Sequence, residues 1–281
     1  MKYRQIVSII GVGFLILLIL GCARETREVR LIYKFKPGQK KIYSNQIKSD
    51  SRIYEGKNLV SSSNLTYRSQ LTEEVLSTTD SSIARIRLTD VSRQPNLYKR
   101  DTTDADTVTH KWTLEYLMDA NGKVLEIFPQ NPHGNEWLEY YKNYYEQALP
   151  VLPGIPITAG YSWSQTVKLI IKDEGSTQVE TTYRLKALAR EAGYDCAIIE
   201  YQGSLVLPYR KTTANGTEIE RLDKARTKGT IYFAYKEGAI VRQDEIYEVE
   251  IAGKKLTGEA TISFLSMSKR SSSMVLTERF E

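Results

Sequence analysis

Residues 230–249, with the sequence TIYFAYKEGAIVRQDEIYEV, decide the class of fold. Apolar and polar side chains alternate from Thr230 to Tyr235 and again from Ile240 to Val249, which is the two-residue period of a half-buried β-strand. Glu237-Gly238, between the two runs, is a turn signal. The stretch therefore predicts a β-hairpin.

The same alternation recurs along much of the chain, in segments rich in the residues that strands favour. Because these segments are joined by short turns with little helix between them, we expect a mainly β fold built on curved antiparallel sheet rather than on βαβ units. The other predicted strands are Leu31 to Phe35, Ile83 to Leu88, Trp112 to Tyr116, Ile198 to Tyr201 and Leu256 to Phe264. The other predicted turns are Pro37-Gly38, Asn121-Gly122, Asn215-Gly216 and Ala252-Gly253.

The central part of the chain departs from this pattern. Residues 129–156 hold five of the eight prolines, and Asn135 can cap a helix that ends at Leu149. Five aromatic side chains share one face of this predicted helix: Trp137, Tyr140, Tyr141, Tyr144 and Tyr145. One interpretation is that the face packs on the sheet as core. The other is that the helix lies over a concave sheet and walls a ligand cavity, with its phenol groups at the rim.

The first 22 residues have the three parts of an export signal. Lys2 and Arg4 are basic, and Ile6 to Leu20 form an apolar run of 15 residues, shorter than the about 20 residues of a membrane-spanning helix. The following Gly21-Cys22 completes Ile19-Leu20-Gly21-Cys22, which resembles the lipobox of bacterial lipoproteins. The resemblance implies cleavage after Gly21 and a diacylglycerol on the sulfur of Cys22. The alternative is a plain secretory signal or anchor in which Cys22 is incidental.

Lipidation would place the protein in the bacterial cell envelope. Stable anchoring needs more than one acyl chain, and a diacylglycerol plus an N-acyl group meets that need. Since Ala23 is not the aspartate that retains many such proteins at the inner membrane, the resemblance implies the outer membrane, facing the periplasm. Loss of residues 1–21 lowers the formal net charge from +5 to +3, which is too balanced to favour a nucleic-acid partner.

The mature chain divides into two similar halves. Gly38 and Gly160 each open a β-rich stretch, and each stretch ends in a hairpin around a glycine, Gly122 or Gly238. We therefore expect two β-meander halves around the helix. The predicted boundaries are a signal peptide at 1–21, a lipidated N-terminus and tether at 22–30, a first half at 31–128, a Pro-flanked helical connector at 129–159, a second half at 160–268 and a tail at 269–281.

Three short motifs extend the resemblance to envelope lipoproteins of unknown activity. They are Lys36-Pro37-Gly38, Pro150-Val151-Leu152-Pro153-Gly154 and Gly160-Tyr161-Ser162-Trp163. A sheet curved around a helix is also similar to the half-barrel of periplasmic lipoprotein carriers, an analogy of fold alone. The resemblance implies no catalytic activity.

Nothing in the sequence indicates a catalytic site, a metal site or a cofactor. Asp101, Asp104 and Asp106 lack the glycine and the closing glutamate of a calcium loop. The chain has no Gly-x-Ser-x-Gly motif and no Gly-rich phosphate loop, and its two cysteines exclude a disulfide framework. Cys196, within a predicted strand, is expected to be a buried, inert thiol. The mixed charges from Arg210 to Lys228 fit a solvated hairpin or a contact with anionic lipid head groups.

Two functions from different classes are favoured, and an enzyme that uses a pair of carboxylates is a third alternative. The first is a lipid-anchored, non-enzymatic protein that binds a lipid, acyl chain or similar apolar ligand between sheet and helix. The alternative is an envelope interaction protein with a filled core, which binds another protein or a glycan through a Tyr-rich surface. The sequence does not indicate an oligomeric state.

Overall fold

The computed structural model describes residues 27–79, 82–95, 107–129, 149–171, 175–213, 216–257 and 260–281. These ranges contain thirteen strands and no helix. The strands are β1 (Val29–Arg30), β2 (Lys40–Glu55), β3 (Asn58–Thr79), β4 (Ile83–Pro95), β5 (Thr107–Asp119), β6 (Val124–Pro129), β7 (Pro156–Ile157), β8 (Ser162–Ile171), β9 (Gly175–Glu191), β10 (Tyr194–Thr212), β11 (Glu218–Ala234), β12 (Ala239–Thr257) and β13 (Ala260–Phe280).

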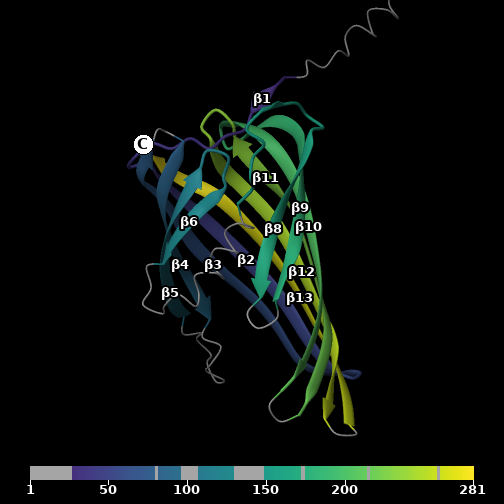
Figure 1. The fold of residues 1–281 in the computed structure, drawn as a ribbon. Helices are drawn as coiled ribbons and strands as arrows, with labels where there is room; N and C mark the ends of the chain where they lie inside the picture. The colour runs from purple at the N-terminus through teal and green to yellow at the C-terminus, as the bar shows by residue number, and fades with distance from the viewer. Residues whose placement is uncertain are drawn as a thin grey trace, which may run out of the picture.

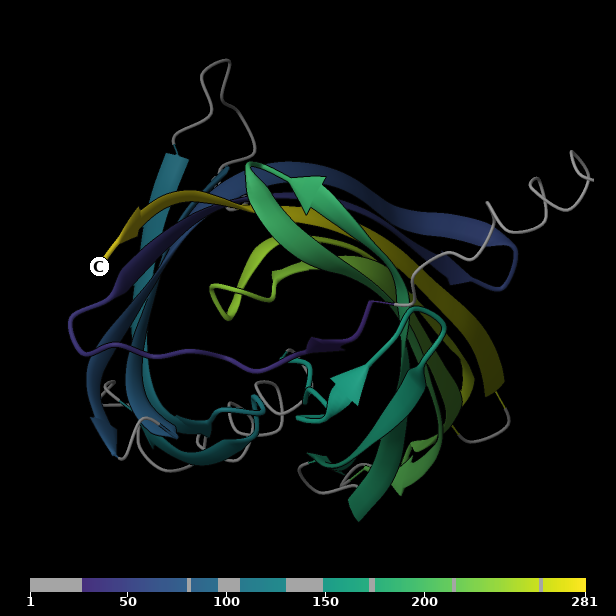
Figure 2. The same ribbon diagram turned by 90° about the horizontal axis from the view of Figure 1, so that it is seen from above.

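Eleven of the strands form one antiparallel sheet in the order β6-β5-β4-β3-β2-β13-β12-β11-β10-β9-β8. Strands β2 to β6 and strands β8 to β13 are two meanders, and they join where β2 pairs with β13. Seen from above, the sheet curls around a concave face (Figure 2). The predicted mainly β, curved antiparallel class is confirmed. The predicted helix that ends at Leu149 falls at residues 135–148, outside the described residues, and the described part contains no helix to support it.

The segment of residues 31–36 crosses the mouth of the curled sheet, next to β1 (Figure 2). Leu31, Tyr33 and Phe35 are buried in alternation, as predicted, but the segment is not a strand. Its backbone bonds to hairpin turns rather than to a neighbouring strand: the amide of Tyr33 donates to the carbonyl of Ala120 at 2.7 Å and that of Lys34 to the carbonyl of Gly238 at 3.2 Å. The predicted alternation of buried side chains is therefore confirmed, whereas the predicted strand is wrong, because a strand needs a neighbouring strand to bond along its length.

Two of the predicted features around residue 253 are wrong. Ala252-Gly253 is not a turn, because both residues lie within β12 and pair with β11 and β13. The segment Leu256 to Phe264 is not one strand, since β12 ends at Thr257 and β13 begins at Ala260. Gly253 serves close packing instead: a Cβ there would lie 2.6 Å from the ring of Phe264. The predicted turns at Gly122 and Gly238 are confirmed, with φ of +94° and +65°.

The C-terminal residues belong to the sheet. Strand β13 runs to Phe280 and pairs with β2 along almost its whole length, so most of residues 269–281 are strand rather than a tail. The sequence did not indicate this strand, because Ser271-Ser272-Ser273 interrupts the alternation of apolar and polar residues. At the other terminus the expected tether also contributes a strand, since Val29 is buried and pairs with Ile157 of β7.

The sheet has a packed end and a far end. At the packed end, near β1 in Figure 1, the concave face carries the core. The far end consists of the long hairpins in the lower part of Figure 1. In the hairpin between β2 and β3, Ile53, Leu59 and Val60 are exposed. The largest fully buried core side chains include Leu31, Ile86, Leu114, Tyr116, Met118, Leu152, Leu185, Ile199, Ile231 and Phe233.

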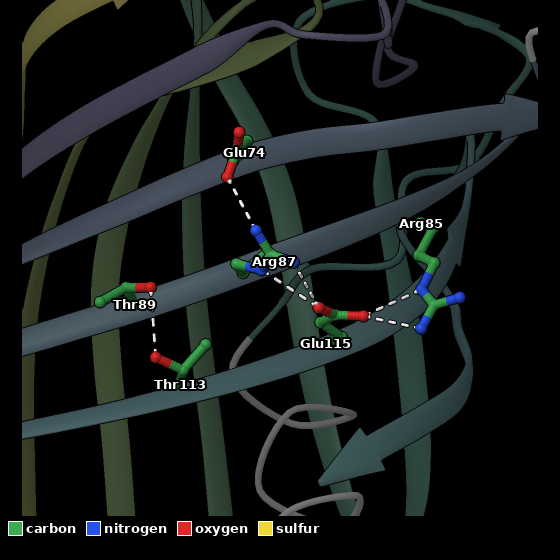
Figure 3. A network of polar contacts seen from close by, with 6 residues as sticks. All are labelled: Glu74, Arg85, Arg87, Thr89, Thr113 and Glu115. Atoms are coloured by element: carbon green, nitrogen blue, oxygen red, sulfur yellow. Dashed lines mark hydrogen bonds and ion pairs between the residues drawn. The ribbon is translucent and has the colours of Figure 1, made fainter. Parts of the chain in front are cut away.

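A charge network holds β4 and β5 together on the opposite face of the sheet (Figure 3). Glu115 is only 3% exposed, and its carboxylate accepts hydrogen bonds from Arg85 Nε at 3.0 Å and Arg87 Nη2 at 2.9 Å. Arg85 also lies over the ring of Phe128, 4.8 Å from its centroid. Glu74 on β3 extends the network to Arg87 at 3.5 Å. Each charge-assisted contact is stronger than a neutral hydrogen bond, so this face is rigidly cross-linked.

Candidate functional site

A cavity of about 210 Å³ lies on the concave face, between β2–β5 on one side and β12 and β13 on the other. Tyr33 of the crossing segment and Leu149 also border the cavity. The described residues that line it are Tyr33, Lys41, Tyr43, Asn45, Ile47, Ser69, Leu71, Glu73, Leu88, Asp90, Trp112, Tyr116, Met118, Leu149, Ile240, Gln243, Glu245, Arg270, Ser272 and Met274.

Strand register places a polar row across the concave face where the packed core ends. Asn45 on β2 is directly opposite Ser69 on β3, and Ser69 is directly opposite Ser92 on β4. On the other side of Asn45 the row continues with the apolar Met274 on β13 and then with Gln243 on β12. Because successive side chains of a strand point to opposite faces, the next row on the concave face lies two residues further along each strand. The cavity therefore has an apolar wall toward the packed end and polar side chains beside it.

The apolar wall is built from neighbouring strands. Leu71 on β3 is diagonal to Leu88 on β4, two residue pairs along the ladder, and Tyr116 and Met118 on β5 are each 1% exposed. Trp112, directly opposite Asp90, is partly buried and packs against the same core. A wall of large apolar side chains with a few polar groups is the usual lining of a small-molecule site.

A buried ion pair also lines the cavity, at its border with the packed end. Lys41 and Glu73 are directly opposite each other on β2 and β3, and Lys41 Nζ lies 2.6 Å from Glu73 Oε1. Their side chains are only 3% and 15% exposed. Burial raises the pKa of Tyr33 well above its ordinary value, and the charge of Glu73 raises it further. The phenol of Tyr33 therefore stays protonated and keeps its hydrogen-bond donor.

Three buried oxygen atoms on the cavity wall make no hydrogen bond within the described part of the chain: Tyr33 Oη, Asn45 Oδ1 and Asp90 Oδ1. A buried polar atom without a partner costs about 1–3 kcal/mol. Burial raises the pKa of the Asp90 carboxyl, while hydrogen bonds from Ser69 and Trp112 lower it in part. The three residues belong to the cavity lining, but these oxygen atoms themselves are covered by protein atoms.

Aromatic rings continue the concave wall toward β8. The rings of Trp163 and Tyr183 stack with centroids 5.4 Å apart, and Tyr201 follows at 5.8 Å from Tyr183. Gly229 makes room for the ring of Tyr201, since a Cβ there would lie 2.6 Å from it. Gln243 Nε2 donates to the hydroxyl of Tyr201 at 3.1 Å, which links this aromatic row to the cavity.

Three larger hollows, of about 710, 640 and 430 Å³, are lined mainly by side chains of the opposite face. Their linings are polar or charged, as at Arg184, Glu200 and Lys228 of the first. They lack the apolar wall and the unpartnered buried atoms of the smaller cavity. The cavity on the concave face is therefore the better candidate site.

The residues that the sequence singled out as site residues all lie outside the described part of the chain. This holds for Gly21 and Cys22 and for the aromatic face of Trp137, Tyr140, Tyr141, Tyr144 and Tyr145. Sequence reasoning did not select the cavity residues. One signal was present: Asp90 continues the two-residue period of the buried Ala84, Ile86 and Leu88, so a carboxyl occupies an inward position.

No protein-family model matches the chain, and no curated protein matches it significantly. Among the described residues, no group of three or more His, Cys, Asp or Glu side chains could hold a metal ion. None of the described segments forms a helix of the length and hydrophobicity that crossing a membrane requires. Cys196 is a free, fully buried cysteine, which confirms its predicted burial.

Proposed function

We propose that this protein is a lipid-anchored, non-enzymatic protein of the bacterial cell envelope that binds an apolar or lipid-like ligand on its concave face. One observation carries the proposal: a cavity whose wall combines the apolar Leu71, Trp112 and Met274 with polar side chains, among them Gln243, Arg270 and Ser272. Apolar atoms of a ligand would gain about 25 cal/mol for each Å² removed from water. A polar group on the ligand would bond to these polar side chains and orient it.

The anchor in this proposal is the lipid on Cys22. Six residues, 23–28, separate Cys22 from Val29 in β1, and a fully extended chain of that length spans roughly 20 Å. The tether would therefore hold the packed end of the sheet near the membrane surface. A ligand leaving or entering the bilayer would then have a short path to the concave face.

The direct test is binding by a soluble form of the protein that starts at Ala23. This form keeps every described strand, because β1 begins at Val29. Native mass spectrometry should detect a co-purified lipid, and a dansylated undecanoic acid should become fluorescent on binding. Leu71→Trp should weaken binding by filling the cavity, whereas Thr72→Trp, one residue along β3 and facing the other way, should not. Absence of both co-purified lipid and probe binding would overturn the proposal.

The alternative of a solid interaction protein is less well supported. It requires a filled interior and outward-facing Tyr140 and Tyr144, both of which lie outside the described residues. Among the described residues, the cavity on the concave face favours the first proposal. If the soluble form bound no lipid but captured a defined envelope protein with Leu71→Trp unimpaired, the alternative would replace the first proposal.

A further inference from the structure

Arg270 lies at the edge of the cavity that faces the far end of the sheet. It sits on the concave face of β13, directly opposite Tyr247 on β12 and Ser49 on β2. Its guanidinium lies over the ring of Tyr247, 5.4 Å from the centroid. A ring contact of this kind orients the guanidinium without using its five N–H donors.

Within the described residues, the guanidinium of Arg270 has no ion-pair partner. The nearest acidic side chain by register is Glu245, which is diagonal to Arg270 across β12 and β13. Glu245 Oε1 accepts a hydrogen bond from Thr227 on β11, on the side away from β13. The other cation of the cavity, Lys41, is bound to Glu73. Arg270 is thus the cavity cation whose charge is not neutralised in this part of the chain.

Small hydroxyl side chains surround this cation. Ser268 and Ser272 flank Arg270 on the same face of β13, and Ser49 lies across from it on β2. Serine hydroxyls can donate to an anion, and their size leaves space above the guanidinium. Cation and hydroxyls together are the donor set that a carboxylate or phosphate accepts from.

The apolar wall begins within reach of this donor set. Met274, which lines the cavity, lies four residues beyond Arg270 on the same face of β13. At about 3.3 Å per residue, the two positions are roughly 13 Å apart. A molecule with one anionic end and an apolar chain of medium length spans that distance.

We propose that the cavity binds a single-chain amphiphile with an anionic head, whose head group lies on Arg270 and whose chain lies among Met274, Leu71 and Trp112. This inference rests on the proposed function and adds the class and the orientation of the ligand. A fatty acid and an alkyl phosphate share the required chemistry, an oxyanion on a single chain. A neutral lipid of the same length lacks it.

The experiment compares dodecanoate, dodecyl phosphate and dodecanol as competitors for the dansylated probe on the soluble form. Because an anion on a partly exposed guanidinium gains a charge-assisted contact, the acid or the phosphate should compete about tenfold better than the alcohol. The stronger of the two anions identifies the head group. This comparison needs no variant, so a folding defect cannot obscure it.

Arg270→Gln and Lys269→Gln form a matched pair of variants. Each removes one positive charge, but Lys269 is on the other face of β13 and pairs with Glu248 at 3.0 Å. Arg270→Gln should abolish the preference for the anions and leave dodecanol competition unchanged, whereas Lys269→Gln should change neither. Competition by dodecanol equal to that by the anions, unaffected by Arg270→Gln, would overturn the orientation while leaving the proposed function intact. Failure of all three ligands to compete would overturn both.

Discussion

Lys34 and Gly238 join the crossing segment to the hairpin between β11 and β12. The amide of Lys34 donates to the carbonyl of Gly238 at 3.2 Å. A Cβ on Gly238 would lie 2.6 Å from Lys34 Cγ and 2.8 Å from the carbonyl oxygen of Ile32. Tyr33 makes the corresponding contact with the hairpin between β5 and β6, at Gly122. One segment thus ties the equivalent hairpins of the two meanders together, which closes the packed end above the cavity.

Gly238→Ala should therefore destabilise the protein more than a glycine-to-alanine change in open space. Gly56 is the matched control, because its φ of +59° is close to the +65° of Gly238 and no atom lies within 4 Å of its Cβ position. In both variants, left-handed backbone strain should lower the free energy of unfolding by about 1–2 kcal/mol. Crowding should add roughly 1–3 kcal/mol for Gly238→Ala alone. Urea unfolding followed by tryptophan fluorescence measures the stability of both variants. Equal losses of stability would show that the crossing segment moves aside at no energetic cost.

Glu115→Gln should destabilise the sheet by about 1.5–3 kcal/mol, since it leaves Arg85 and Arg87 without their shared carboxylate. We expect less than the about 3–5 kcal/mol of a fully buried pair, because the guanidinium groups are partly exposed. Glu74→Gln, at the exposed end of the same network, should cost under about 1 kcal/mol. Equilibrium unfolding in urea gives both values. A loss at Glu74 as large as that at Glu115 would contradict this account of the network.

Asp90→Asn should change how stability depends on pH. Burial raises the pKa of Asp90 in the folded protein above its unfolded value of about 3.9, so its contribution is fully present below pH ~4 and is lost as pH rises through the folded pKa. Asparagine does not titrate. The free energy of unfolding of the variant minus that of the wild type should therefore increase between pH 4 and pH 7. Thermal unfolding at several pH values measures this difference, and a constant or decreasing difference would contradict the raised pKa.

The thiol of Cys196 should be unreactive in the folded protein. It is fully buried, and burial raises its pKa to about 11, so little thiolate exists at pH 8. A thiol-specific chromogenic reagent should label no cysteine in the native mature protein and one cysteine per chain in guanidinium chloride. Two labelled thiols after denaturation would show that Cys22 is present and unmodified.

Cys22→Ser should prevent membrane anchoring. Without the sulfur, no diacylglycerol can be attached, so the protein should remain unprocessed or leave the membrane fraction. Fractionation and the mass of the purified chain measure both outcomes. The matched control is Cys196→Ser, which should remain membrane-bound because its sulfur is buried in the sheet. An acylated, sedimenting Cys22→Ser variant would overturn the proposed anchor.

Local patterns predicted local structure well. The alternation at Ile83 to Leu88 and at Ile240 to Val249 lies within β4 and β12, and the turn signals at Gly122 and Gly238 mark real turns. These features depend on near neighbours in the chain. The predicted turn at Gly253 was wrong because the glycine there depends on a residue distant in the sequence: Phe264 on the next strand leaves no room for a Cβ.

The candidate site was not predictable in the same way. Asn45 lies beside Met274 because β2 pairs with β13, a contact between strands more than 200 residues apart in the sequence. Pairing over such a separation is decided by the register of the whole sheet, which no local pattern encodes. Arg270 could not be distinguished from Lys269 in the sequence, although one faces the cavity and the other an acidic partner on the outer face.

The sequence by itself determined parts of β4, β5, β10, β11 and β12 and the turns at Gly122 and Gly238, because alternation and turn chemistry act over a few residues. It also predicts an export signal with a lipobox-like end, and this stays a prediction. Only the tertiary structure decided that the two meanders join at β2 and β13 into one curled sheet and that a segment with strand-like alternation crosses its mouth. The cavity exists because of this long-range pairing, which brings Tyr33, Asn45, Asp90 and Arg270 together in its lining.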